Sequence, residues 1–171
     1  MDIWLTSDTH FDHINVIEYE KRPFENHIEM TEELIQNWNK KVKRHDLIFH
    51  LGDVFFCRAN RMKEIADRLN GRKILIRGNH DQHYTNGKFK KLGFNVFNYY
   101  FLEDILLSHY PQDERPLRIA KEEGFIIGNA HGHVHSKIDG LDQKLYKCVS
   151  VEATNYSPVH LDDVKFHFYR C

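Results

Sequence analysis

Four short stretches of this sequence gather side chains that can bind a metal ion. Each is rich in histidine, aspartate or asparagine, and each contains or follows a run of apolar residues. The stretches are TSDTHFDH (6–13), FHLGDVFF (49–56), IRGNHDQH (76–83) and NAHGHVHS (129–136). A fifth apolar run, DILLSH (104–109), ends in His109. One explanation is that these are unrelated polar ends of separate loops, but the fivefold repetition of one arrangement favours a shared metal site.

The spacing of the polar residues suits chelation. Asp8 and His10 are two residues apart, so an extended backbone would direct both side chains to one side. His133 and His135 repeat that spacing. Each pair is therefore expected to bind a cation from the end of one strand.

Two glycines stand directly before further candidate ligands. Gly52 precedes Asp53, and Gly78 precedes Asn79. A residue without a side chain lets the backbone turn tightly beside a bound ion. Asp53 and Asn79 are therefore predicted to reach the same metal site.

The predicted ligand set contains two carboxylates, one amide oxygen and four imidazoles, and no thiolate. Its members are Asp8, His10, Asp53, Asn79, His109, His133 and His135. Mixed nitrogen and oxygen ligands suit transition metals, whereas Ca²⁺ and Mg²⁺ prefer oxygen alone. Because seven groups exceed the needs of one open catalytic ion, we expect two divalent ions that share a carboxylate. We expect Mn, with Fe, Ni, Co or Zn as alternatives.

The charge of such a site predicts its substrate. Two divalent cations, two carboxylates and a bridging hydroxide together keep a net positive charge. A site of that sign binds a phosphate ester and stabilises the extra negative charge of an in-line displacement.

The apolar pattern predicts the elements that position these residues. Strands are expected at 3–6, 47–51 and 73–76, and helices at 30–42 and 62–69. Asn26 and Glu29 fit a capping box before the first helix. The alternation of strands and helices indicates an α/β fold with a parallel or mixed sheet, in which ligands gather at the carboxyl ends of the strands.

Two later segments alternate between apolar and polar residues. They are LYKCVSVE (145–152) and VKFHFY (164–169), and both are predicted to be strands.

The ordered set DTH, GD, GNHD, a lone His after a strand and GHVH resembles the calcineurin-like metallophosphoesterase superfamily, over residues 8–135. The resemblance implies a four-layer α/β/β/α sandwich with two mixed sheets and a dinuclear metal centre between them. It assigns to one ion Asp8, His10, Asp53 and His135. It assigns to the other Asp53, Asn79, His109 and His133. His80 would be the catalytic residue that gives a proton or hydrogen bond to the leaving oxygen.

One departure from the family pattern concerns His80. Where the protein serine/threonine phosphatase branch has GDxxDR, this chain has GDVFFC, so Phe56 and Cys57 replace an aspartate and an arginine. His80 thereby lacks the carboxylate that usually orients it, and Asp81 and Asp12 are the candidates to replace that group. The departure favours phosphodiesters over phosphomonoesters.

Several other polar residues near the motifs have less specific interpretations. His50 is expected in the core or behind a ligand, His131 outside the metal site, and His13 and His83 along the substrate cleft. The candidate phosphate contacts are Arg22, Arg58 and Arg77, and Arg77 fits a structural ion pair equally well.

The composition is that of an ordinary soluble domain. The chain has 171 residues, so a single domain over residues 1–171 is expected. Its formal net charge is −1, so no overall electrostatic field is expected to attract nucleic acid or membranes. No run approaches the roughly 18 apolar residues of a membrane span. Cys57, Cys148 and Cys171 show no CxxC spacing, which favours free thiols in a reducing compartment, so we expect a cytoplasmic protein.

The residues together predict a hydrolase for small phosphate esters or nucleotides, in which a metal-bound hydroxide attacks phosphorus. Nucleic acid is a conceivable substrate that the charge does not indicate. The alternative is a non-catalytic scaffold on the same fold that serves protein contacts. The retention of seven ligands and His80 argues against it.

Overall fold

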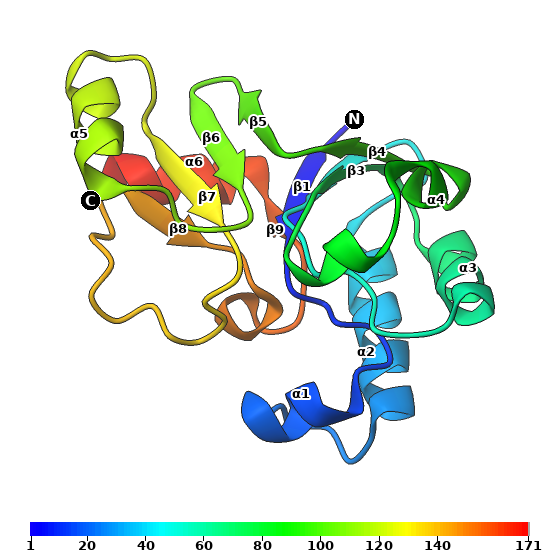
Figure 1. Cartoon of the computed structure of the whole chain (residues 1–171). Helices are drawn as coiled ribbons and strands as arrows, with labels where there is room; N and C mark the ends of the chain where they lie inside the picture. The colour runs from blue at the N-terminus through cyan, green and yellow to red at the C-terminus, as the bar shows by residue number, and fades with distance from the viewer. Residues whose placement is uncertain (171) are drawn as a thin grey trace.

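The computed structural model describes residues 1–170, and Cys171 lies outside the described residues. Two mixed sheets stand face to face (Figure 1). The first sheet has the order β4-β3-β2-β1-β9, in which β1 to β4 are parallel and β9 is antiparallel to β1. Its strands are β1 (Ile3–Thr6), β2 (Leu47–His50), β3 (Arg72–Ile76), β4 (Phe94–Phe97) and β9 (Val159–His160).

The second sheet has the order β5-β6-β7-β8, with β5 antiparallel to β6 and the other neighbours parallel. Its strands are β5 (Tyr99–Leu102), β6 (Ile105–Ser108), β7 (Gly128–His131) and β8 (Tyr146–Cys148). The helices are α1 (Ile14–Tyr19), α2 (His27–Lys41), α3 (Ala59–Arg68), α4 (Asn86–Lys91), α5 (Glu114–Glu122) and α6 (Leu161–Arg170). Short 3-10 turns cover His80–His83 and Val151–Thr154.

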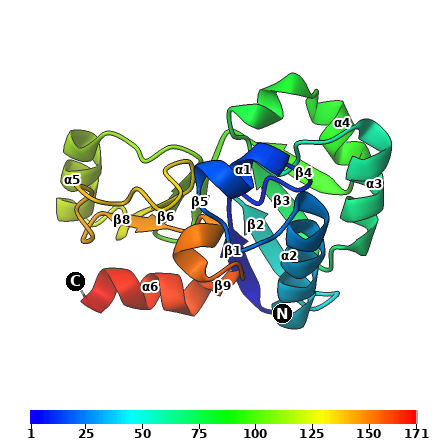
Figure 2. The ribbon, with the colours of Figure 1, turned by 90° about the horizontal axis from the view of Figure 1, so that it is seen from below.

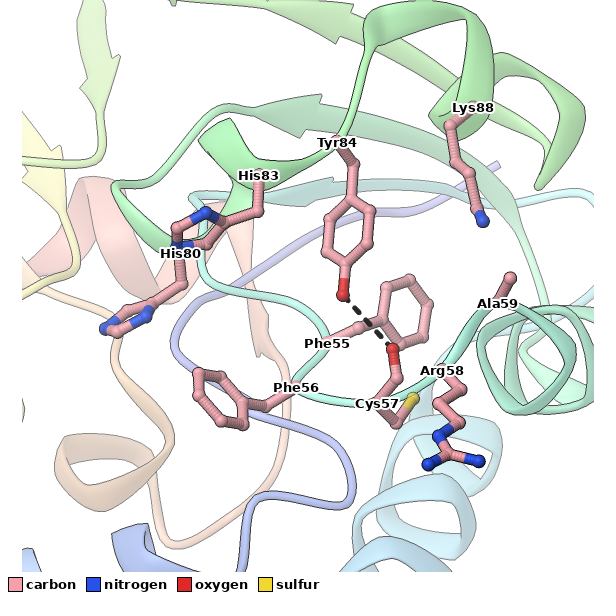
Figure 3. Close-up of a pocket in the computed structure, with 9 residues that line it drawn as sticks. All are labelled: Phe55, Phe56, Cys57, Arg58, Ala59, His80, His83, Tyr84 and Lys88. Atoms are coloured by element: carbon pink, nitrogen blue, oxygen red, sulfur yellow. Dashed lines mark hydrogen bonds between the residues drawn. The ribbon is translucent and has the colours of Figure 1, made fainter.

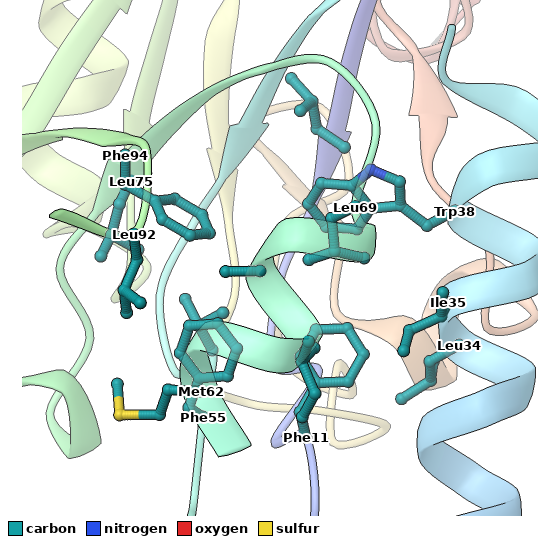
Figure 4. Packing of buried hydrophobic residues seen from close by; sticks show 14 of the residues in the cluster. Phe11, Leu34, Ile35, Trp38, Phe55, Met62, Leu69, Leu75, Leu92 and Phe94 are labelled. Carbon is teal, nitrogen blue, oxygen red and sulfur yellow. The ribbon is translucent and has the colours of Figure 1, made fainter. Parts of the chain in front are cut away.

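Three hydrophobic clusters separate the layers. Helices α2, α3 and α4 cover the outer face of the first sheet, where Trp38 and Met62 pack with Leu75 and Phe94 (Figure 4). Helix α5 covers the outer face of the second sheet through Leu117 (Figure 2). The predicted four-layer α/β/β/α sandwich with two mixed sheets is therefore confirmed.

The cluster between the sheets contains inward side chains from both of them. Leu5 and Phe49 of the first sheet meet Leu107 and Ala130 of the second. Because side chains alternate along a strand, Ile48 and Leu75 point instead to the outer cluster. Helix α6 joins the inner cluster, and a side chain at Gly128 of β7 would collide with the ring of Phe168.

The prediction of a strand at 164–169 was wrong, because this segment belongs to α6. Leu161, Val164 and Phe168 are buried at helical spacing, whereas Phe166 is 60% exposed. The alternation that suggested a strand therefore came from an aromatic side chain on the solvent face. Asp162 lies in the first turn, where a carboxylate favours the helix.

The strand predicted at 145–152 is shorter than expected, because only Tyr146–Cys148 forms β8 and Val151 opens a 3-10 turn. The capping box at α2 is half present. Asn26 Oδ1 accepts hydrogen bonds from the N–H groups of Ile28 and Glu29, but the Glu29 carboxylate accepts from Glu25 N rather than Asn26 N. No helix among residues 1–170 is long and apolar enough to cross a membrane.

Candidate metal centre

The seven predicted ligands follow the carboxyl ends of parallel strands in both sheets. After strands of the first sheet come Asp8, His10, Asp53 and Asn79. After strands of the second sheet come His109, His133 and His135. The two sheets thus present their ligand-bearing loops to a common edge, as expected for an α/β fold.

The expectation of an extended backbone at these residues was wrong. Asp8 and His10 lie beyond the end of β1 with φ of 56° and 48°, and His133 and His135 have φ of 69° and 52°. The left-handed region is unfavourable for residues other than glycine, and such strain clusters at functional sites. Hydrogen bonds to the loop after β2 hold the first pair: Asp8 N donates to Gly52 O at 2.9 Å and His10 N to Asp53 O at 3.1 Å.

The two carboxylate oxygens of Asp8 have different surroundings. Oδ2 accepts hydrogen bonds from Ser150 Oγ at 2.7 Å and from His133 N at 2.9 Å. Oδ1 is buried and has no hydrogen-bond partner, and it lies 4.0 Å from His135 Nε2. The protein therefore fixes the carboxylate through one oxygen and leaves the other for a cation.

Asp53 stands between the two groups of ligands. Its Oδ1 accepts from His80 N at 2.9 Å. Its Oδ2 lies 3.7 Å from His10 Nε2 and 3.5 Å from His109 Nε2. One oxygen therefore faces imidazoles that belong to different predicted ions.

The imidazole of His109 is oriented with a lone pair toward the site. Its Nδ1 lies 2.7 Å from Leu51 O, which can only accept, so Nδ1 carries the proton. Its Nε2 then presents a lone pair to Asn79 Oδ1 at 3.0 Å. A cation beside these two acceptors would be a ligand partner for both.

Two further histidines also present ring nitrogens that could bind a cation. His135 Nδ1 donates to Glu152 Oε1 at 2.9 Å, which leaves Nε2 free. Both ring nitrogens of buried His10 lack a hydrogen-bond partner. There are two groups of residues whose potential ligand atoms lie within 4.8 Å of one another. One group is Asp8, His10 and His135, and the other is Asp8, Asp53 and His109. These residues therefore fit divalent metal ions, although Asp8 rather than Asp53 is common to these two groups.

Burial shifts the pKa values at this site strongly. It raises the pKa of Asp53 to about 8, helped by the charges of Asp8 and Asp81. Burial also raises the pKa of Asp8 and lowers that of His109 to about 4. The histidine is thus neutral, which is the form that binds metal, and a bound cation would restore the ionised carboxylates.

The sequence profile of the calcineurin-like phosphoesterases matches residues 1–167. The chain belongs to this family. It is 38% identical to the uncharacterized protein MJ1445 of Methanocaldococcus jannaschii, over 94% of this chain and 87% of that protein. It is 30% identical to the Gene 66 protein of Mycobacterium phage D29, over 80% of each.

Two solved structures share the fold of this calcineurin-like phosphoesterase. The protein of unknown function AQ665 from Aquifex aeolicus aligns with a TM-score of 0.75 and 28% identity, over 96% of this chain and 98% of that one. The nuclease MPE of Pseudomonas putida aligns with a TM-score of 0.53 and 23% identity, over 78% of this chain and 61% of that one.

The side chain of His80 in this family member packs against rings and is 37% exposed. Its ring lies edge-on to Phe56 and to His10, with centroids 5.6 Å and 5.2 Å away. Phe56 in turn stacks on His13 at 3.9 Å. The Nε2 atom of His80 lies 4.0 Å from Asp53 Oδ2.

Neither aspartate considered for orienting His80 does so. The Asp81 carboxylate accepts from the backbone N–H groups of Asp53, Val54 and Gly78 at 2.8–3.1 Å, and so ties two ligand loops together. Asp12 forms an ion pair with Arg61 at 2.7 Å. Packing against aromatic rings thus takes the place of the usual ion pair.

Two residues behind the ligands were missed in the sequence. Glu152 accepts from His135 and also from Arg22, whose guanidinium lies 2.7 Å away. Ser150 donates to Asp8. Both follow β8, so the signal was a serine and a glutamate at the end of a further strand, in a segment noted only for its alternation.

Four of the remaining candidate residues form hydrogen bonds within the protein. Arg22 donates to the carbonyls of Asp8 and Thr9, and Arg77 donates to Asp81 O and Tyr84 O rather than forming an ion pair. The other two are buried histidines. His50 bonds to Thr9 Oγ1 through Nε2, and His131 Nδ1 donates to Gly132 O. Arg58 is exposed beside a cavity that His80 lines (Figure 3).

Proposed function

We propose that this protein is a metal-dependent phosphodiesterase that uses two divalent transition-metal ions, with manganese the best suited. The position of Asp53 Oδ2, 3.7 Å from His10 Nε2 and 3.5 Å from His109 Nε2, carries the proposal, because a carboxylate there can serve both ions. The proposed ligands are Asp8, His10, Asp53, Asn79, His109, His133 and His135. Two such ions, when bound, activate water and neutralise charge on the phosphate.

The proposed role of His80 is to protonate the leaving oxygen. Its backbone N–H is tied to Asp53 Oδ1, so the residue is fixed beside the proposed shared ligand. Its side chain is 37% exposed, whereas that of His109 is fully buried. An imidazole that is next to the ligands and still open to solvent suits proton donation to a bound substrate.

The preference for diesters is supported by the arginines. A phosphomonoester carries a second negative charge that a diester lacks, and phosphatases commonly meet such charge with guanidinium groups. Two of the three candidate arginines, Arg22 and Arg77, instead donate to backbone carbonyls of the protein, and the third, Arg58, lines the cavity beside His80. Phe56 places an apolar ring next to His80, where a leaving group of a diester would lie.

The test is an assay of purified protein on bis-p-nitrophenyl phosphate and p-nitrophenyl phosphate, with Mn, Ni, Co, Zn and Mg in turn. We expect faster hydrolysis of the diester, the highest rate with Mn, and no hydrolysis after chelation. Release of phosphate from phosphoserine peptides, with inert diesters, would contradict the preference. The free thiols Cys57 and Cys148 support a proposed cytoplasmic location, and a single domain over residues 1–171 stays a prediction.

A further inference from the structure

A cavity of about 470 Å³ opens next to the metal centre (Figure 3). Small-molecule sites commonly have volumes of about 300–1,000 Å³. Its wall comes from two segments, residues 55–59 after β2 and residues 80–88 from the 3-10 turn to α4. His80 lines it, whereas the seven proposed metal ligands are not part of its lining.

The wall near His80 is aromatic and held in place. Phe55 is buried, and Phe56 is 46% exposed with its ring stacked on His13. The hydroxyl of Tyr84 donates to Cys57 O at 3.1 Å, which fixes the angle of that ring. Preordered rings of this kind suit a planar aromatic ligand, because little side-chain freedom is lost on binding.

The other wall of the cavity carries positive charge. Among the described residues neither Arg58 nor Lys88 has a carboxylate within ion-pair distance, and Lys88 Nζ lies 5.8 Å from the centre of the Tyr84 ring. Helix α3 begins at Ala59, which also lines the cavity, and its first turn has no acidic residue and no side-chain cap. The charge of this wall therefore complements an anion.

The position of His80 relates the cavity to the reaction. If His80 protonates the leaving oxygen, the group attached to that oxygen lies on the His80 side of phosphorus, where the cavity opens. The residues that depart from the phosphatase pattern, Phe56 and Cys57, are part of its wall. The departure thus replaces a charged pair with an apolar surface for the leaving group.

We propose that this cavity binds the leaving alcohol of the substrate and that this alcohol is a nucleoside that carries a second phosphate. The aromatic wall would contact the base, and Arg58 and Lys88 the phosphate. This inference rests on the proposed phosphodiesterase activity. In the reaction, the oxygen of water bonds to phosphorus and water releases a proton to solvent. The bond from phosphorus to the alcohol oxygen breaks, and that oxygen takes the proton of His80.

Calorimetry with adenosine 5′-monophosphate and ribose 5-phosphate tests the proposal on the full-length protein with Mn²⁺. The two probes share a phosphate and differ in the base, so phosphate binding at the metals cancels in the comparison. We expect the nucleotide to bind about tenfold more tightly, since stacking of one base contributes roughly 1–3 kcal/mol. Equal affinities would overturn the proposal.

Variants then locate the binding. Lys88→Ala should weaken nucleotide binding about tenfold, as expected for the loss of a charged hydrogen-bond donor. Tyr84→Leu should abolish the preference for the nucleotide over ribose 5-phosphate. Lys90→Ala, an exposed lysine of the same helix outside the cavity, is the matched control and should change neither affinity. Unchanged nucleotide affinity in both Lys88→Ala and Tyr84→Leu, with folding verified by circular dichroism, would overturn the assignment to this cavity.

Nucleotide binding and diester hydrolysis, measured on the same protein, distinguish failure of this inference from failure of the proposed function. Hydrolysis of bis-p-nitrophenyl phosphate without a preference for the nucleotide overturns the cavity inference and leaves the phosphodiesterase standing. A preference that depends on Lys88 and Tyr84, in a protein that hydrolyses no diester with any metal, supports the nucleotide site. That result would overturn both the activity and the leaving-group role.

Discussion

Asp53 and His109 come from loops of different sheets, yet Asp53 Oδ2 lies 3.5 Å from His109 Nε2. The same oxygen lies 3.7 Å from His10 Nε2, so a single carboxylate atom stands between imidazoles contributed by both sheets. Because Asp53 is nearly fully buried, ionisation of its carboxyl group would place negative charge in a region of low dielectric. Divalent cations would offset that charge, which is the physical reason to expect Asp53 to serve as a ligand of two ions.

Asp53→Asn should remove activity more completely than His133→Ala or His135→Ala, because only Asp53 is proposed to serve both ions. We expect a loss of about 10³-fold or more in turnover with bis-p-nitrophenyl phosphate, because metal stabilisation of transition-state charge contributes several kcal/mol and each 1.36 kcal/mol is a factor of about ten in rate. Metal content by mass spectrometry should fall below two ions per chain. Two retained ions in Asp53→Asn would contradict the bridging role.

Glu152→Ala should weaken metal binding without removing a ligand. Glu152 holds the Nδ1–H of His135 at 2.9 Å, and loss of such a partner costs about 10–100-fold in metal affinity. Glu152→Gln retains an acceptor and should fall between this variant and the wild type. Glu123→Ala, at an exposed glutamate, is the control. Affinity is measured by titration with Mn²⁺, and equal affinities for Glu152→Ala and the control would show that Glu152 does not support the site.

The strand-end clusters were predictable because ligand residues are close in sequence to the strands that carry them. The motifs around Asp8, Asp53 and Asn79 could be placed at one edge of a sheet from periodicity alone. The reason given for the Asp8 and His10 pair was nonetheless wrong, since both residues are left-handed rather than extended. Local spacing therefore located the residues, but backbone conformation depended on the hydrogen bonds to the loop after β2.

Contacts distant in sequence could not be read in the same way. Ser150 donates to Asp8 from 142 positions away, and Glu152 meets Arg22 from 130 positions away. No sequence motif marks Ser150 or Glu152. Helix α6 was misassigned because Phe166 is exposed at a position where alternation predicted burial, whereas Leu161, Val164 and Phe168 form the buried face.

Gly78→Ala should damage the metal centre, because a Cβ at this position would collide with the Asp53 carboxylate and lie 2.6 Å from Asp53 N. We expect a destabilisation of roughly 1–3 kcal/mol and loss of bound metal. Gly87→Ala, within α4, is the matched control, since the nearest atom to its Cβ is Thr85 Oγ1 at 3.8 Å, and it should stabilise by about 0.4–1 kcal/mol. Chemical denaturation and metal analysis compare the two, and equal metal content in both variants would contradict the close fit.

His50 should make stability fall in acid. Gly52 N donates to its Nδ1 at 3.2 Å, so Nε2 carries the proton and donates to Thr9 Oγ1 at 2.9 Å. Burial lowers the pKa of His50 to about 3, below its usual value of 6.5, so the unfolded chain binds a proton that the folded protein excludes. This contribution to stability is complete above pH 6.5 and is lost as the pH falls toward 3, with a slope of up to about 1.4 kcal/mol per pH unit.

His50→Asn cannot take up that proton, so its free energy of unfolding should depend less steeply on pH between 6.5 and 3. Urea denaturation of metal-free protein at several pH values measures both slopes. The difference between the slopes is the test, because other titrating groups are common to the two proteins. Parallel curves would show that His50 is protonated in the folded state.

His80→Ala should separate leaving-group chemistry from metal binding. The hydrogen bond from His80 to Asp53 Oδ1, at 2.9 Å, comes from the backbone N–H, so an alanine retains it. Both ions should therefore stay bound, while turnover falls by about 10²–10⁴, the usual contribution of a general acid. Neither Asp12 nor Asp81 orients the imidazole, and its ring packs against Phe56 and His10 instead, so we expect the low end of that range.

The size of the loss in His80→Ala should depend on the leaving group. An aryl ester such as a nitrophenyl diester releases an acidic alcohol that needs little protonation, whereas an alkyl diester needs a full proton transfer. Turnover on both esters, with metal content measured in parallel, distinguishes the roles. A larger loss on the alkyl ester with both ions retained is the expected result. Equal losses on the two esters would exclude proton donation by His80, and loss of metal would make His80 a ligand.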